Sequence, residues 1–194
     1  MEIPESIEAA LLDDGHFAHC LSLAARTAAR ELRSQNELAA EGFEKLGDPI
    51  LDFSINNLAD HPCESPIEKL LLHSLMISAY RNWIIPCFRH GGATDFESSE
   101  CSQIVLIESQ AVFWLKGRKA RVDAVVYCPA FPERYVVECD GYEFHSSKEK
   151  FEADRKRDRA IQAMGYQTRR YSGSEIKANH IKLSFDLLCE VCHL

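Results

Sequence analysis

The sequence predicts an α/β fold in which helices flank a mixed central sheet of four to five strands. Apolar residues make up 46% of the 194 residues and charged residues 27%, which is typical of a globular chain with a real core. Short segments with the composition of strands follow one another in the middle of the chain, and segments with helical spacing lie on both sides of them. The predicted order is helix, three or four strands, helix, strand and helix, which is typical of an α/β sandwich.

Residues 1–60 are expected to form a helical region of their own. Ala, Leu, Glu and Arg dominate it, and its apolar positions recur at helical spacing. Gly15 and Gly42 are possible breaks, and the run from Gly47 to Pro49 is expected to close the region. Residues 1–115 carry 18 acidic and 7 basic residues, so these acidic helices are a candidate docking surface for a protein partner.

Residues 61–194 are predicted to form a second unit that starts with another helix. Ser65 is the expected N-cap, Pro66 takes the first helical position and Glu68 the third. Glu68 therefore lies in the first turn, where a capping box accounts for it without any catalytic role.

Four strands are predicted after this helix. The second and third are joined by a turn at KGRK, and the third and fourth by a loop with two prolines. They indicate an antiparallel meander whose central strands are buried on at least one face. Their sequences, in order, are QIVLIES, QAVFWL, ARVDAVVY and RYVVECDGY.

A long helix from Ser147 to Met164 follows, and Gly165 is expected to end it. YQTRRYS predicts a further strand, and a final amphipathic helix begins at SGSEI. The last helix contains CEVCH, which matches the attachment motif of c-type haem. We expect no haem, because the two cysteines continue the apolar spacing and the N-terminal residues lack the pattern of a secretory signal. The expected location is the cytoplasm, since no apolar stretch is long enough to span a bilayer.

Three carboxylates stand inside the predicted third and fourth strands. Asp123 interrupts ARVDAVVY, and Glu138 and Asp140 interrupt RYVVECDGY. Side chains two residues apart on a strand point to the same face, roughly 6–7 Å apart, and Asp123 on the neighbouring strand can face the same spot. Buried carboxylates are costly unless they are paired or bind a cation. The pattern predicts an oxygen-rich site for Mg²⁺ or Mn²⁺ made of these three residues.

A structural interpretation of the same carboxylates is that they form ion pairs with Arg121, Arg169 or Arg170. The occurrence of carboxylates on two neighbouring strands favours the metal site over this alternative. His145, five residues after Asp140, is expected to leave the strand end near the site, where it would donate or accept a proton or bind the metal. A single histidine is more often structural, so both roles stay open.

Basic residues are concentrated around these carboxylates. Residues 116–170 carry 13 Lys and Arg against 9 Asp and Glu, although the net charge of the whole chain is −8. A local positive balance is what a phosphate-binding site needs, although a solvated helix surface at KEKFEADRKRDR also accounts for it. For Arg155 on this helix, an intrahelical ion pair is the alternative to a phosphate contact. The expected contacts to nucleic acid come from Lys119, Arg121, Arg155 and Arg170.

The order of these motifs resembles that of the PD-(D/E)XK nuclease superfamily, and most closely its very-short-patch-repair-like branch. In that branch a strand ending in E-x-D-G is followed by a histidine, a helix with D-x-x-R-D, and a strand that closes with arginine. The resemblance covers roughly residues 62–178 and implies a restriction-endonuclease-like core. The motifs that carry it are SPIEKLL, RVDAVV, VVECDGYEFH and FEADRKRDRAIQAMGYQTRRY.

The resemblance also implies roles for individual residues. Asp123 and Glu138 would bind the metal, and Glu68 would be the auxiliary helix glutamate near it. Asp140 departs from the broader superfamily, which has a lysine at this position to orient the attacking water. Either Asp140 is a further metal ligand or another base substitutes for that lysine. The candidate substitutes are Lys148 and Lys119.

These implications predict a divalent-metal-dependent endonuclease that hydrolyses phosphodiester bonds in DNA rather than RNA, in defence or repair. Mg²⁺ or Mn²⁺ would generate hydroxide from a bound water and neutralise charge on the scissile phosphate. The missing lysine leaves a second hypothesis open, namely a catalytically decayed nuclease-like domain that binds nucleic acid or a partner without cutting.

Overall fold

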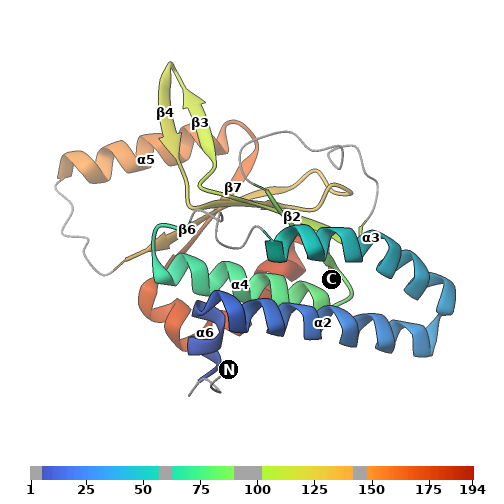
Figure 1. The fold of residues 1–194 in the computed structure, drawn as a ribbon. Coiled ribbons are helices and arrows are strands. Elements are labelled where there is room, and N and C mark those ends of the chain that lie inside the picture. Colours follow the sequence, from blue (N-terminus) through green and yellow to red (C-terminus); the bar gives the residue numbers. More distant parts are fainter. Residues whose placement is uncertain (1–5, 57–62, 90–101, 142–147) are drawn as a thin grey trace.

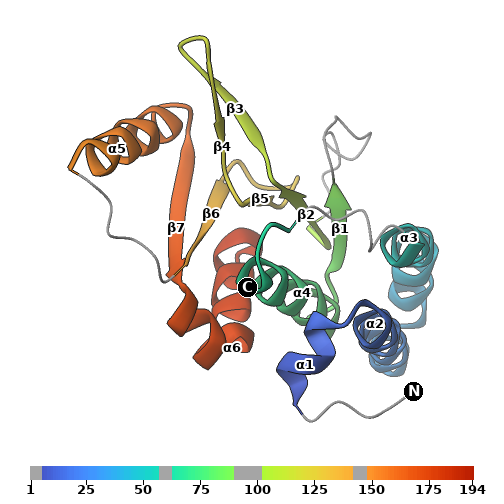
Figure 2. The same ribbon diagram turned by 60° about the vertical axis from the view of Figure 1, so that its left-hand side comes forward.

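A computed structural model of the chain describes residues 6–56, 63–89, 102–141 and 148–194 (Figure 1). Within these ranges the fold is α/β, with N-terminal helices and a mixed sheet between flanking helices (Figures 1 and 2). The predicted fold class is confirmed at this level. None of the described helices is long and apolar enough to cross a membrane.

The main sheet has five strands in the order β1-β2-β5-β6-β7. The two outer pairs, β1 with β2 and β6 with β7, are parallel, whereas β2, β5 and β6 pair antiparallel. Strand β1 is absent from the predicted strands, because it is a five-residue edge strand that contains Pro86. The strands are β1 Ile85–Arg89, β2 Ile104–Ser109, β5 Ala124–Tyr127, β6 Arg134–Asp140 and β7 Tyr166–Ser172.

A two-stranded hairpin, β3 (Val112–Leu115) and β4 (Arg118–Arg121), extends the β2–β5 pair and projects away from the sheet (Figures 1 and 2). Its two-residue loop holds Lys116 at φ 50° and Gly117 at φ 78°, the left-handed conformation that tight hairpin turns require. The predicted KGRK turn is thereby confirmed.

The chain bends where the hairpin leaves the sheet. Gln110 has φ 51° there, and its N–H donates to the carbonyl of Asp123 at 2.7 Å. The predicted single strand ARVDAVVY is therefore divided into β4 and β5, and the expectation that Asp123 lies in mid-strand is wrong. Asp123 lies in the bend immediately before β5, where a side chain is less enclosed than inside a ladder.

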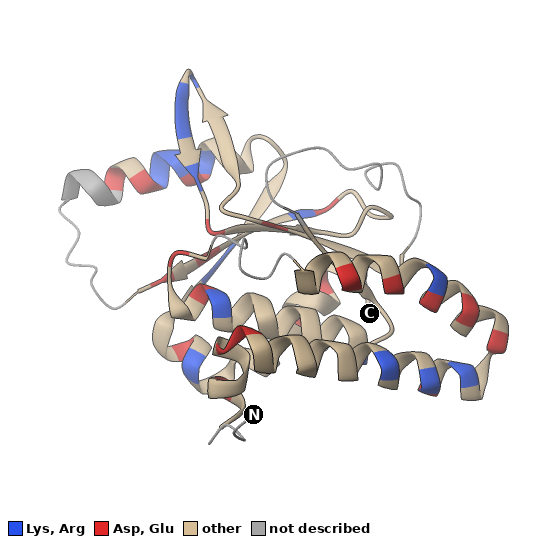
Figure 3. Cartoon of the chain, in the orientation of Figure 1, with Lys and Arg blue, Asp and Glu red and all other residues tan. Residues whose placement is uncertain are grey.

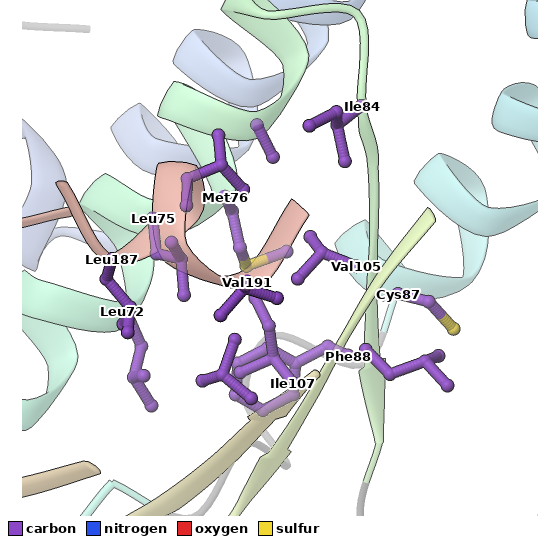
Figure 4. Close-up of a cluster of buried hydrophobic side chains, with 14 of the residues drawn as sticks. Leu72, Leu75, Met76, Ile84, Cys87, Phe88, Val105, Ile107, Leu187 and Val191 are labelled. Atoms are coloured by element: carbon purple, nitrogen blue, oxygen red, sulfur yellow. The ribbon is translucent and has the colours of Figure 1, made fainter. Parts of the chain in front are cut away.

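Helices cover both faces of the sheet. Helices α4 and α6 lie against one face, where α3 contacts β1 and α1 and α2 lie beyond α4, whereas α5 and the hairpin lie on the other face (Figures 1 and 2). Figure 4 shows the core between α4, α6 and the strands, where Met76 and Val191 meet Val105. The helices are α1 Ile7–Leu12, α2 Asp14–Gln35, α3 Glu37–Asn56, α4 Pro66–Arg81, α5 Lys148–Gln162 and α6 Gly173–Cys192.

The N-terminal helices break at other positions than predicted. The breaks occur at Asp13 and Asn36, whose side chains each accept a hydrogen bond from a backbone N–H three residues on. Gly15 and Gly42 lie inside helices, and α3 continues through the run Gly47–Pro49. The helix persists because its C-terminal half is buried. At Gly47 it passes so close to β1 that a Cβ would lie 3.5 Å from the Ile85 side chain.

The buried side chains of the N-terminal helices belong to the same continuous cluster as those of the sheet and of α6. The predicted boundary between residues 60 and 61 falls in the range 57–62, outside the described residues. The sheet positions the carboxylates, and α4 and α5 contribute further charged side chains from opposite faces.

Candidate active site

Asp123, in the bend just before β5, lies next to Glu138 of β6. Ala124 of β5 is the partner of Val137 of β6, so one step further along this antiparallel register Asp123 stands opposite Glu138. Residues directly opposite in an antiparallel pair have their side chains on the same face. The Asp123 carboxylate also accepts a hydrogen bond from the Cys139 N–H at 2.6 Å, which fixes it against β6. The predicted juxtaposition of these two carboxylates is thereby confirmed.

Both carboxylates are withdrawn from water, and this changes their acidity. Burial raises the pKa of Glu138 to about 7; the Arg157 guanidinium opposes that rise and the charge of Asp123 adds to it. Burial likewise raises the pKa of Asp123 to about 6, against the hydrogen bond from Cys139 and with a further rise from the charge of Glu68. The charge of Asp123 raises the pKa of Glu138, and the charges of Glu68 and Asp140 raise that of Asp123, because like charges at short range disfavour the ionised form.

Two arginines from the elements that follow β6 contact the carboxylates. Arg157 of α5 donates from Nη2 to the Glu138 carboxylate at 2.8 Å, and the Glu138 side chain is only 9% exposed. Arg170 of β7 stands opposite Glu138 in the parallel register and donates to Asp140 at 3.2 Å. The same guanidinium donates to both oxygens of Asp158, at 2.9 and 3.0 Å. The connection from β6 through α5 to β7 thus brings both guanidinium groups back to the end of β6, where Glu138 and Asp140 lie.

Glu68 of α4 reaches the site from the face of the sheet opposite to α5. Ser65 caps α4 as predicted, and its hydroxyl donates to the Glu68 carboxylate at 2.8 Å. The second Glu68 oxygen accepts from the Glu64 N–H at 2.9 Å and from the Gln110 side-chain amide at 2.8 Å. The residue is 6% exposed, and its charge acts on Asp123. Glu68 therefore combines a capping role with a place beside Asp123.

The three carboxylates predicted to bind metal do not form one ligand group here. In the part of the chain that the structure describes, no three His, Cys, Asp or Glu side chains are placed to hold one ion together. The physical reason is that the guanidinium groups compete for them: Arg157 holds Glu138, and Arg170 holds Asp140.

The donor chemistry of Asp123 and Glu138 nevertheless fits Mg²⁺ or Mn²⁺. Both offer oxygen only, and both have a raised pKa, so a cation beside them would favour the charged form that binds it. Mg²⁺ commonly takes one or two carboxylates from a protein and completes its shell with water and substrate phosphate. A two-carboxylate site therefore needs no third ligand from the chain.

The remaining predicted residues are spread over the site and its surroundings. Arg121, a predicted nucleic-acid contact, is ion-paired with Glu64. Lys119, one of the two candidate substitutes for the missing lysine, lies over the Trp114 ring of the hairpin, 5.2 Å from its centroid. Arg155 is exposed on α5. Lys148 begins α5, but its side chain lies outside the described part, and His145 lies in the range 142–147, which is outside it as well.

The CEVCH motif belongs to the packing of α6. Cys192 is buried, and its thiol donates a hydrogen bond to the Cys128 sulfur, which brings the pKa of Cys128 down to about 7. His193 forms an ion pair with Glu133 at 3.3 Å and stacks on Phe131. The expectation that the two cysteines continue the apolar spacing agrees with this burial of Cys192.

Arg157, Asp158 and Gln110 belong to the site although none was selected from the sequence. Arg157 and Asp158 form part of the D-x-x-R-D pattern, which was a signal for them. That pattern alone does not say which carboxylate the arginine meets, because the partner lies 19 residues away on β6. Gln110 carries no motif, and only the bend at β2–β3 brings its amide to Glu68.

Without metal, raising the pH from about 4 to about 7 is expected to remove stability contributed by Asp123 and Glu138. The unfolded chain releases these protons near pH 4, whereas the folded chain holds them until about 6 and about 7. Because the folded state binds more protons in this window, stability falls as the pH rises through it. Thermal unfolding in chelator across the window measures the effect.

Glu138→Gln is expected to flatten that pH profile, since the amide does not titrate. Glu152→Gln, at an exposed position on α5, is the matched control and should leave the profile unchanged. Equal slopes for the wild type and for Glu138→Gln would contradict the raised pKa of this carboxyl.

In comparisons of the chain with known proteins, no family model, no curated protein and no solved structure matches it.

Proposed function

We propose that this chain is a divalent-metal-dependent endonuclease built on a restriction-endonuclease-like core, which hydrolyses phosphodiester bonds in DNA. The observation that carries the proposal is the pair Asp123 and Glu138, which lie opposite each other just before β5 and in β6, Asp123 half-buried and Glu138 buried. Two adjacent carboxylates whose pKa values are both raised are characteristic of functional sites and are not needed for packing a core.

In the proposed reaction Asp123 and Glu138 hold the cation. When bound, the ion supplies Lewis-acid chemistry: it withdraws negative charge from a phosphate oxygen and lowers the pKa of water. The Cys139 N–H keeps the Asp123 carboxylate oriented toward β6, and Gln110 and Ser65 keep Glu68 beside it. Asp140 stays a predicted third ligand, which would have to leave Arg170 to join the pair.

Arg157 and Arg170 would bind the scissile phosphate. Guanidinium groups make paired, charge-assisted hydrogen bonds to phosphate oxygens. Asp140 stands where the superfamily motif has a lysine, and the Arg170 guanidinium lies 3.2 Å from it, so a fixed positive charge is present at this point of the site. We propose that Arg170 supplies the charge stabilisation that the lysine would give.

The surroundings of the site are suited to a phosphate backbone. Basic side chains lie on the hairpin and on α5, the two elements on either side of the strand ends that carry Asp123 and Glu138 (Figure 3). A nucleic acid crossing from one to the other would pass over Asp123 and Glu138. Phosphate neutralisation by such residues gives affinity without sequence preference. The exposed ones are Lys116, Arg118, Lys119, Arg121, Arg155, Lys156 and Arg159.

The experiment that tests the proposal has two readouts. We expect cleavage of plasmid or oligonucleotide DNA with Mg²⁺ or Mn²⁺ and none in chelator. We also expect Mn²⁺ to raise the unfolding temperature of the wild type, since an ion that binds only the folded chain stabilises it. The Asp123→Asn protein should show neither effect. Absence of cleavage for any DNA or RNA, together with absence of a Mn²⁺-dependent shift, would overturn the proposal.

A second candidate function is a nuclease-like domain that binds nucleic acid without cutting it. The pairing of Glu138 with Arg157 and of Asp140 with Arg170 favours it, because both carboxylates are already neutralised by the chain itself. Binding of DNA that is unchanged by chelator and by Asp123→Asn, without cleavage, would decide for this candidate.

A further inference from the structure

The β3–β4 hairpin presents an aromatic and a basic side chain on its outer face. Trp114 and Lys119 are partners in the hairpin register, and Trp114 is 65% exposed. The Lys119 ammonium lies 5.2 Å from the centroid of the indole ring. Val112 stands two residues before Trp114 on the same face and is 49% exposed. An indole left this open to water beside a cation is unusual for a side chain that only packs.

The hairpin does not need Trp114 for its own anchorage. Its inner face carries Phe113, which is 7% exposed and meets Tyr166 of β7 edge-on, with ring centroids 5.0 Å apart. Strand β3 also contacts α5 on that side. The anchoring contacts therefore lie on one face of the hairpin, and the Trp114–Lys119 pair lies on the other.

This outer face leads directly to the carboxylates. Lys119, Arg121 and Asp123 alternate along one stretch of chain, and Arg121 is tied to Glu64, whose N–H donates to Glu68. Asp123 is four residues beyond Lys119, and even a fully extended chain of four residues sets the distance between their Cα atoms at no more than roughly 14 Å. A polynucleotide with one phosphate at Asp123 and Glu138 can therefore place a nearby nucleotide on Trp114.

We propose that Trp114 stacks on an unpaired base of the nucleic acid, so that the chain prefers a substrate with a single-stranded stretch next to the scissile bond. The inference rests on the proposed function and names the substrate class of that site. A duplex hides the faces of its bases in the stack, whereas single strands expose them to aromatic side chains. The charge of this face supports the same occupant, since Lys119 and Arg121 share it with the indole and would meet the phosphates.

Fluorescence anisotropy with labelled single-stranded and duplex oligonucleotides, in chelator so that nothing is cut, tests the inference on the full chain. Trp114→Ala is expected to weaken binding of the single strand by about tenfold and that of the duplex by less than about twofold. Trp114→Phe should recover part of the loss, because it keeps a ring. Val112→Ala, at an exposed apolar position on the same face, is the matched control and should change neither affinity.

Lys119→Ala separates charge from stacking. It is expected to weaken both ligands and to reduce the salt dependence of binding by about one phosphate contact. Equal losses for single strand and duplex in Trp114→Ala, or no loss in either, overturn the stacking inference even if Asp123-dependent cleavage is found. A loss confined to the single strand upholds it even if the protein never cuts, in which case the endonuclease proposal alone fails.

Discussion

Asp123→Asn is expected to lower the rate of DNA cleavage by about 10³-fold, or about 4 kcal/mol of transition-state stabilisation, without unfolding the protein. The loss follows from removing one of the two charges that would hold the cation. The fold should survive, because the asparagine amide oxygen can still accept the hydrogen bond from the Cys139 N–H. Cleavage rates and thermal unfolding in chelator, measured on the same preparation, check both halves of this prediction.

The unfolding temperature of Asp123→Asn in chelator should be no lower than that of the wild type. Burial and the neighbouring charges of Glu68 and Asp140 raise the pKa of Asp123, so the charged form is disfavoured in the folded chain. Asp52→Asn, at an exposed position on α3, controls for the change of net charge and should cleave like the wild type. Wild-type cleavage by Asp123→Asn would remove Asp123 from the mechanism.

Arg157→Met is expected to lower the free energy of unfolding by about 3 kcal/mol at about pH 9, where the Glu138 carboxyl is ionised in the folded chain and would be left buried without its cation. Glu138 is 7% exposed, so water cannot replace the lost guanidinium. The loss should be smaller at about pH 5, where the Glu138 carboxyl is protonated in the folded chain. Urea unfolding at the two pH values measures it.

A double variant identifies the origin of this loss. Adding Glu138→Gln to Arg157→Met removes the unpaired charge and should restore a large part of the stability, which is the coupling expected of residues in contact. Arg159→Met, exposed on the same helix, is the control for removing a cation from α5 and should cost little. If Arg157→Met is as stable as Arg159→Met, the pair with Glu138 contributes nothing to the fold.

The local features of the fold were predictable from the sequence. Ser65 caps α4, the KGRK turn joins β3 to β4, and the alternation along β6 places Glu138 and Asp140 on one face. In each case the residues that predict the feature lie within a few residues of the feature itself, so local hydrogen bonding and backbone geometry are enough to predict it. Edge strand β1 and the helix through Pro49 were missed, because burial against other elements stabilises them despite weak local signals.

The sequence by itself determined that this chain has a mixed sheet with carboxylates in or beside two neighbouring strands. Only the tertiary structure decided which groups meet them: Arg157 holds Glu138, Arg170 holds Asp140, and Asp123 stands in a bend instead of a strand. The physical reason is that such partners are chosen by the path of the chain from β6 through α5 to β7. Packing over the whole sheet sets that path, so it cannot be predicted from the residues next to each carboxylate.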